Sequence, residues 1–269
     1  MQATATAPAN SAVRELQRLV KQSSHYLLGI VGGLAVGFIS FPIFTRTFSV
    51  AEYGLIDLVQ KVLLLVIAFS KGGLQNSVLR FFDGPAFRSN PGSERRFYST
   101  MFTGVGLASM AVYVAFAVVV AFGTRFGRIE TQVGQVLVLA AILIPLRSVQ
   151  SVVSSFLRVQ ERTRAYSVTN IVIRAGTVAA VLAMFPVLGR NIQAYFWGTV
   201  LVEAAVLIWM AASLYKAGVL RFLTFDRALF VAAASFGLPL IVQELAGIVL
   251  DSGDRFLVQS YLGAEPLGY

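Results

Sequence analysis

The chain has 269 residues, of which 57% are hydrophobic and only 13% are charged. A soluble globular domain carries about 25% charged residues, so roughly half of the expected surface charge is missing. The 22 Lys and Arg residues outnumber the 13 Asp and Glu residues, but the hydrophobicity outweighs a nucleic-acid interpretation of this positive charge. The composition excludes a water-soluble enzyme, a coiled coil and a disordered protein, and it predicts an all-α integral membrane protein.

The residues needed for common catalytic sites are scarce. The chain has no Cys and a single His, His25, which excludes a disulfide framework, a thiolate metal site, a histidine cluster and a Ser-His-Asp site. It also lacks a Gly-x4-Gly-Lys-Ser/Thr motif for ATP. One carboxylate pair, Asp251 and Asp254, has a spacing that suggests metal-assisted sugar transfer, but no soluble catalytic domain accompanies it. We therefore expect no enzyme activity, no metal and no cofactor.

Seven apolar runs are long enough to cross a membrane, which takes about 20 residues. They follow an N-terminal tail, residues 1–25, in which Val13–Lys21 predicts a short basic helix at the membrane surface. The predicted spans of this multi-pass helix bundle are Tyr26–Phe44, Leu55–Phe82, Phe97–Phe122, Val133–Leu157, Ala165–Leu188, Ile192–Tyr215 and Leu229–Leu257.

The cations that flank these spans predict the topology. Alternate connections, beginning with the N-terminal tail, carry thirteen Lys and Arg residues: Arg14, Arg18, Lys21, Arg80, Arg88, Arg95, Arg96, Arg158, Arg162, Arg164, Lys216, Arg221 and Arg227. The opposite set carries four: Arg46, Arg125, Arg128 and Arg190. Because positive charge is retained inside the cell, the N-terminus is predicted to be cytoplasmic, in a protein of the cytoplasmic membrane.

Charged residues also lie inside the spans, where each costs roughly 2.5–3.5 kcal/mol on insertion. At 100° per residue, polar residues fall on one face of each of four spans. The stripes are Asp57, Lys61, Lys71 and Gln75; Arg147, Ser151, Ser154 and Arg158; Ser167, Asn170, Arg174 and Thr177; and Glu244, Asp251 and Arg255. Four striped helices predict a bundle around a hydrated, charged interior.

Spacing separates these charges into two groups. Asp57 with Lys61 and Asp251 with Arg255 are i,i+4 pairs in the favourable order, so mutual neutralisation explains them as well as function does.

Lys71, Arg147 and Arg174 have no acid within helical reach, and together with Lys61 they are the candidate anion-binding residues. Glu203 and Glu244 are lone acids deep in their spans. They could couple transport to an ion, as could Asp251, or they could pair with an arginine on another helix.

An unpaired cationic lining attracts an anion, and the planar guanidinium of arginine suits phosphate. The loops are too short to form a catalytic domain. A transporter of an anionic substrate therefore fits the sequence better than an enzyme.

Several segments resemble the polysaccharide-biosynthesis flippases. They are Phe41–Gly54, which closes on an acid-Tyr-Gly element; Gly72–Phe81, a glycine-bearing second helix; Ser155–Arg162 followed by Ala165-Tyr166; and Phe236–Leu240 with Asp254-Arg255-Phe256 and Leu262–Tyr269. Their order and spacing carry the resemblance to this family of the multidrug/oligosaccharidyl-lipid/polysaccharide exporter superfamily.

The resemblance implies two helical lobes around a central cavity that works by alternating access. The implied partners are membrane lipids and the substrate, a polyprenyl-pyrophosphate-linked oligosaccharide for cell-surface polysaccharide such as lipopolysaccharide O-antigen. Residues 26–216 would form the first six-helix lobe, and residues 217–269 a loop and the first helix of the second. We expect the chain to be a fragment whose second lobe comes from a downstream continuation or from a homodimer.

Three other functions fit the sequence less well. A multidrug or cation antiporter of the same superfamily would favour acids over the unpaired cations. A seven-helix retinal protein needs a lysine in its last span, and Leu229–Leu257 has none; the predicted cytoplasmic N-terminus disfavours a receptor. A membrane glycosyltransferase would need a sizeable polar loop.

Overall fold

The computed structural model describes residues 9–82, 92–221 and 224–262, with the side chains of 9–23, 25, 26, 28 and 251–262 left undescribed. Within these residues the regular structure is entirely α-helical. The helices are α1 (Ala9–Thr47), α2 (Val50–Lys71), α3 (Leu74–Phe81), α5 (Ser93–Arg125), α6 (Thr131–Ala141), α7 (Leu143–Val159), α8 (Thr163–Leu188), α9 (Ile192–Lys216) and α10 (Arg227–Leu262).

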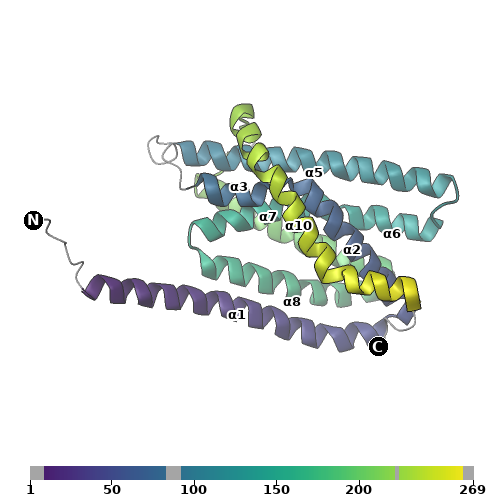
Figure 1. The fold of residues 1–269 in the computed structure, drawn as a ribbon. Coiled ribbons are helices and arrows are strands. Elements are labelled where there is room, and N and C mark those ends of the chain that lie inside the picture. Colours follow the sequence, from purple (N-terminus) through teal and green to yellow (C-terminus); the bar gives the residue numbers. More distant parts are fainter. Residues whose placement is uncertain (1–8, 83–91, 222–223, 263–269) are drawn as a thin grey trace, which may run out of the picture.

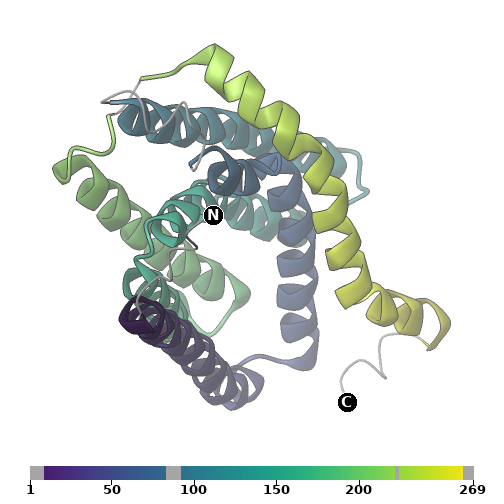
Figure 2. The ribbon, with the colours of Figure 1, turned by 60° about the vertical axis from the view of Figure 1, so that its left-hand side comes forward.

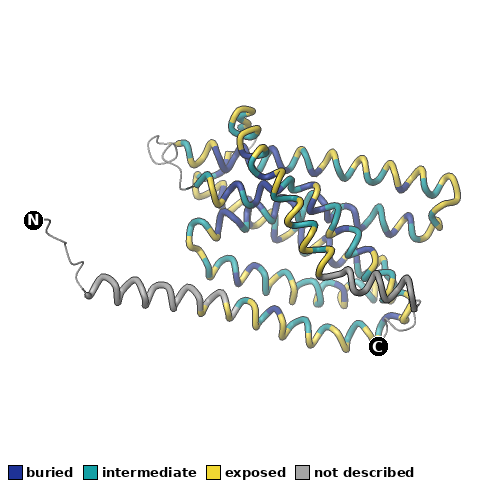
Figure 3. Tube along the Cα trace, in the orientation of Figure 1, coloured by how far each residue is buried: buried dark blue, intermediate teal, exposed yellow. Residues whose placement is uncertain are grey.

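Seven segments of the described chain are long and apolar enough to span a membrane, which confirms the predicted all-α polytopic bundle. The helices lie lengthwise side by side, and α10 crosses α2 and α3 obliquely (Figure 1). A second view shows α1 beside α8 on one side and α10 on the other side of α2 (Figure 2). Exposed apolar residues cover the outside of the bundle, while the buried residues gather along α7 and its neighbours (Figure 3).

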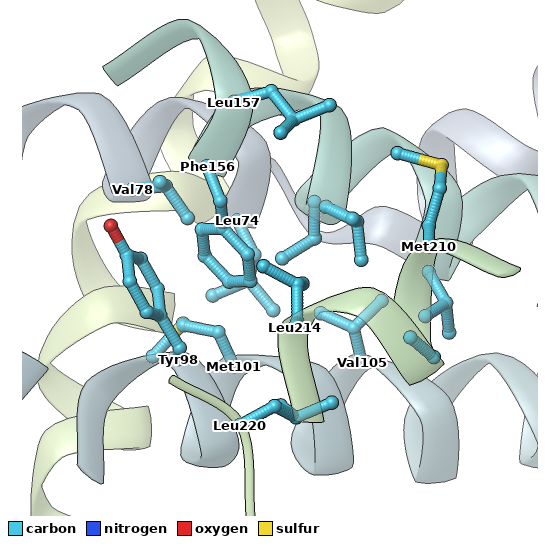
Figure 4. Packing of buried hydrophobic residues seen from close by; sticks show 14 of the residues in the cluster. Leu74, Val78, Tyr98, Met101, Val105, Phe156, Leu157, Met210, Leu214 and Leu220 are labelled. Atoms are coloured by element: carbon cyan, nitrogen blue, oxygen red, sulfur yellow. The ribbon is translucent and has the colours of Figure 1, made fainter. Parts of the chain in front are cut away.

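The interior contains two apolar clusters, one toward each end of the bundle. The first, around Tyr98 and Phe156, whose ring centroids are 4.1 Å apart, joins α3, α5, α7 and α9 (Figure 4). The second, around Leu63, Ile144 and Phe196, joins α2, α6, α7 and α9. Polar residues separate the two clusters on α7, where they are Arg147 and Ser148, and on α9, where it is Glu203. Ser70 and Lys71, at the end of α2, separate the α2 residues of the second cluster from the α3 residues of the first.

The second span is broken, whereas the sequence predicted one uninterrupted helix over Leu55–Phe82. Helix α2 ends at Lys71, and Gly72 and Gly73 adopt left-handed φ values of 58° and 66° before α3 begins. Glycine adopts this conformation without a Cβ penalty. The backbone of α10 lies against the break, since a Cβ atom on Gly73 would be only 2.0 Å from the carbonyl oxygen of Gly237.

Replacing Gly73 with alanine is expected to lower the free energy of unfolding by about 2 to 4 kcal/mol, because the left-handed conformation and the contact with α10 both oppose a side chain. Unfolding by sodium dodecyl sulfate in mixed micelles, followed by circular dichroism, measures the change. Gly54→Ala is the matched control, since Gly54 is helical and a Cβ there meets nothing within 4 Å. Equal stability of the two variants would contradict the packing argument.

Two other boundaries differ from the sequence prediction. The predicted surface helix Val13–Lys21 and the first span are parts of one helix, α1. The fourth span consists of α6 and α7, which meet at Ile142. Pro145 lies in the first turn of α7, where proline's missing N–H group is tolerated.

Candidate functional site

Arg147, Glu203 and Lys71 form a charged layer between the two apolar clusters, whereas Asp57 and Lys61 lie at the level of the second cluster. Arg147, Arg174 and Glu203 each lie about 16 to 20 Å along their helices from the end that carries the α7–α8 and α9–α10 connections. This depth is near the middle of a hydrocarbon core about 30 Å thick. The layer therefore contains the groups whose burial is most expensive.

The sequence predicted that Arg147 is unpaired, and this prediction is wrong. The structure places Arg147 at the centre of a hydrogen-bond network that joins three helices. Its Nε donates to Oε1 of Glu203 on α9 at 2.9 Å, and its Nη1 donates to Oε1 of Gln60 on α2 at 2.8 Å. Gln60 in turn donates to the Tyr195 hydroxyl at 3.3 Å. Glu203 is 5% exposed. Of the two roles that the sequence left open for Glu203, the structure therefore shows the interhelical partner.

Lys71 also has a partner, so its predicted unpaired state is wrong as well. Its Nζ lies 2.5 Å from Oε1 of Glu244 on α10, and Gln75 of α3 donates to the other oxygen of the same carboxylate at 2.9 Å. The three side chains come from α2, α3 and α10. The remaining acceptor of Gln75, Oε1, is buried without a hydrogen-bond partner.

Lys61 forms the local pair that its spacing indicated. Its Nζ lies 2.5 Å from Oδ2 of Asp57, one turn earlier in α2, and the carboxylate side chain is 48% exposed. Asp57 and Gln60 line a cavity of about 130 Å³ with four aromatic rings and an isoleucine. The full lining is Phe44, Phe48, Tyr53, Ile56, Asp57, Gln60 and Tyr195.

Arg174 differs from the other three candidate cations. Its side chain is exposed, and no hydrogen bond or ion pair reaches it within the part of the chain that the structure describes. It lines a cavity of about 200 Å³ between α1 and α8, the α1–α8 groove. The groove is formed by Gly29, Ile30, Gly33 and Leu34 of α1 and by Tyr166, Ser167, Asn170 and Arg174 of α8. Three of the four residues of the predicted α8 stripe thus line one cavity.

Glycines of α1 make room for this groove. A Cβ atom on Gly33 would be 3.2 Å from Nε of Arg174, and one on Gly29 would be 2.6 Å from the Ser167 side chain. Small residues let membrane helices approach closely. Sequence reasoning missed Gly29 and Gly33, although their i,i+4 spacing on one helix face was a usable signal.

The structure describes only some of the remaining predicted side chains. The side chain of Asp251, a candidate for ion coupling, lies outside the described residues, as do those of Asp254 and Arg255. Arg158 donates to Ser155 at 2.8 Å. Among the described residues, no three or more His, Cys, Asp or Glu side chains lie together in a group that could hold a metal ion.

Comparisons with known proteins agree with this architecture. A sequence model of the family described as polysaccharide biosynthesis protein matches residues 19–269. No curated protein matches the chain. A crystal structure described as MATE in the straight conformation shares the fold with a TM-score of 0.60 at 13% sequence identity, over 85% of this chain and 53% of that one. The chain thus spans about half the length of that structure.

Proposed function

Because the chain belongs to the family of polysaccharide biosynthesis proteins, within the multidrug/oligosaccharidyl-lipid/polysaccharide exporter superfamily, we propose that it is the substrate-binding lobe of a lipid-linked oligosaccharide flippase. The substrate would be a polyprenyl-pyrophosphate-linked oligosaccharide, moved from the cytoplasmic to the outer leaflet of the cytoplasmic membrane by alternating access. The N-terminus would be cytoplasmic, and α10 would begin a second lobe that comes from further chain or from a second copy.

The exposed guanidinium of Arg174 is the observation that carries this proposal. It lies in a polar groove near mid-membrane and is the one candidate cation without an acidic partner in the described part of the chain. An arginine in such surroundings is costly unless an anion or water accompanies it. A pyrophosphate would accept two parallel hydrogen bonds from the guanidinium, and Ser167 and Asn170 add polar groups to the groove.

The pairing of the acids disfavours the alternative, a multidrug or cation antiporter. Glu203 is bound to Arg147, Glu244 to Lys71 and Asp57 to Lys61. Each of these carboxylates is already neutralised, so none offers an unbalanced negative charge to a cationic drug. The groove around Arg174 would repel such a compound.

Binding to the purified chain in nanodiscs tests the function. We expect polyprenyl pyrophosphate to bind at least about 10-fold more tightly than the uncharged polyprenol of the same length, as a charge-assisted hydrogen bond worth about 1.5–3 kcal/mol requires. Equal affinity for the two lipids would refute the anion site. Tighter binding of a lipophilic quaternary ammonium compound would favour the antiporter instead.

A further inference from the structure

Helix α10 is held against α3 and the glycine break by contacts that need no ion pair. The Ser77 hydroxyl donates to the backbone carbonyl of Ala233 at 2.7 Å, and both residues are fully buried. The guanidinium of Arg80 lies 4.2 Å from the ring centroid of Phe236. With the contact between Gly73 and Gly237, these interactions form the seat of α10.

The end of α10 that follows the α9–α10 connection is tied to α5. Asp226, one residue before the helix, lies 2.8 Å from Arg96 through its carboxylate, and its backbone N–H donates to Thr100 at 3.1 Å. The backbone N–H of Arg221 donates to Ser99 at 2.9 Å. Motion of α10 relative to α2 would therefore pivot near Asp226 and separate the contacts that follow it along the helix, from Ala233 onward.

The ion pair of Glu244 with Lys71 lies further along α10, away from that pivot. The two side chains are 24% and 13% exposed, so water screens the pair poorly. Lys71 is the last residue of α2, directly before the left-handed glycines. Near the contact, the buried Oε1 of Gln75 has no hydrogen-bond partner among the described residues, and an acceptor left unsatisfied in this way destabilises the arrangement that buries it. The position of α10 seen in the structure is therefore stabilised by the ion pair of Lys71 with Glu244, but it leaves one buried hydrogen-bond acceptor, Oε1 of Gln75, without a partner in the described part of the chain.

We propose that Lys71 exchanges partners during transport, binding Glu244 while α10 is seated and the anionic head of the substrate when α10 lifts. A ligand shifts a conformational equilibrium only through different affinities for the two states. A pyrophosphate can take the Lys71 ammonium only after the Glu244 carboxylate has left it, so the anion stabilises the lifted state. This exchange rests on the proposed function. In it, binding of the substrate causes α10 to move away from α3 and the glycine break.

The absence of cysteine from the native sequence allows a direct test. The S77C variant places a thiol beneath α10, where a charged maleimide reaches it only when α10 lifts. The probe ligand is inorganic pyrophosphate, with the full chain in nanodiscs. S109C is the matched control, because Ser109 is also fully buried but bonds only to the carbonyl of Gly106 in its own helix.

We expect pyrophosphate to speed alkylation of the S77C thiol about 10-fold and to leave the S109C thiol protected. Adding Glu244→Gln to S77C should raise the rate without pyrophosphate, and adding Lys71→Gln should remove the response to pyrophosphate. Both substitutions replace the charged group with a neutral amide. The exchanged pair, Lys71→Glu with Glu244→Lys, should again protect the S77C thiol from alkylation, but pyrophosphate should not speed the reaction.

Phosphorus NMR of pyrophosphate in the same samples separates the two proposals. Pyrophosphate that binds, and loses affinity with Arg174→Gln, but does not change S77C labelling would overturn the exchange and leave the flippase proposal intact. If the S77C thiol remained protected from alkylation in the Glu244→Gln variant without pyrophosphate, the exchange of partners by Lys71 would also be overturned. Absence of any pyrophosphate binding would overturn both.

Discussion

Replacement of Arg174 with glutamine is expected to weaken the binding of polyprenyl pyrophosphate by about 10- to 150-fold while leaving the fold intact. This range corresponds to the loss of about 1.5–3 kcal/mol from a hydrogen bond to a charged group. The Arg174 side chain is exposed and makes no ion pair with any residue that the structure describes. Its removal therefore leaves no buried acid behind. Lipid binding in nanodiscs measures the affinity, and circular dichroism checks the helices.

Three further variants sharpen this test. Arg174→Lys keeps the charge but loses the planar fork, so its affinity should be intermediate. Gly33→Ala should also weaken binding, because the new Cβ would lie 3.2 Å from Nε of Arg174, whereas Gly37→Ala on the same helix meets nothing. Arg190→Gln, at the exposed end of the same span, should bind as the native chain does. An unchanged affinity of Arg174→Gln would refute the site.

Replacement of Glu203 with alanine is expected to lower the free energy of unfolding by about 3 to 5 kcal/mol. The substitution leaves Arg147 inside the bundle with only the neutral acceptor of Gln60, and an uncompensated charge in such surroundings is strongly destabilising. Unfolding in mixed micelles with sodium dodecyl sulfate measures the loss. Asp57→Ala is the comparison, since that carboxylate is 48% exposed and its pair should contribute about 1 kcal/mol or less.

The double variant Arg147→Met with Glu203→Leu distinguishes pairing from packing. Replacing a whole buried ion pair with apolar residues is often neutral, so the double variant should recover most of the stability that Glu203→Ala loses. A double variant as unstable as the single one would show that shape rather than charge is responsible. The pair also implies that Arg147→Ala impairs folding, because it strands the buried Glu203 carboxylate, and loss of transport in that variant would be no evidence of substrate binding.

The spans and the depth of their charges were predictable from the sequence. Insertion depends on contiguous apolar residues, so each run of about 20 residues reports its own tendency to cross a membrane. The seven predicted spans match the seven apolar helical segments of the described chain. Ser167, Asn170 and Arg174 share one cavity, as the 3.6-residue period of a helix predicted, because that period is also a local property.

The partners of the charges on other helices were decided by the tertiary structure. Glu203 lies 56 positions from Arg147, and Glu244 lies 173 positions from Lys71. Sequence spacing predicts only neighbours on one helix, so it identified the pair of Asp57 with Lys61. It left the pairing of Glu203 with an arginine of another helix as one of two alternatives, and it did not predict the pairing of Glu244 with Lys71. Which helices meet depends on how their side chains pack.

The break at Gly72 and Gly73 also depends on both local sequence and tertiary packing. The two glycines permitted a left-handed turn, but the apolar run around them predicted a continuous span, and the backbone of Gly237 lies against the turn from far along the chain. The sequence by itself thus determined which segments enter the membrane and where their charges lie, because both follow from local hydrophobicity and helical period. Only the tertiary structure decided which of the four candidate cations has no acidic partner among the described residues, because that depends on the packing of helices distant in sequence.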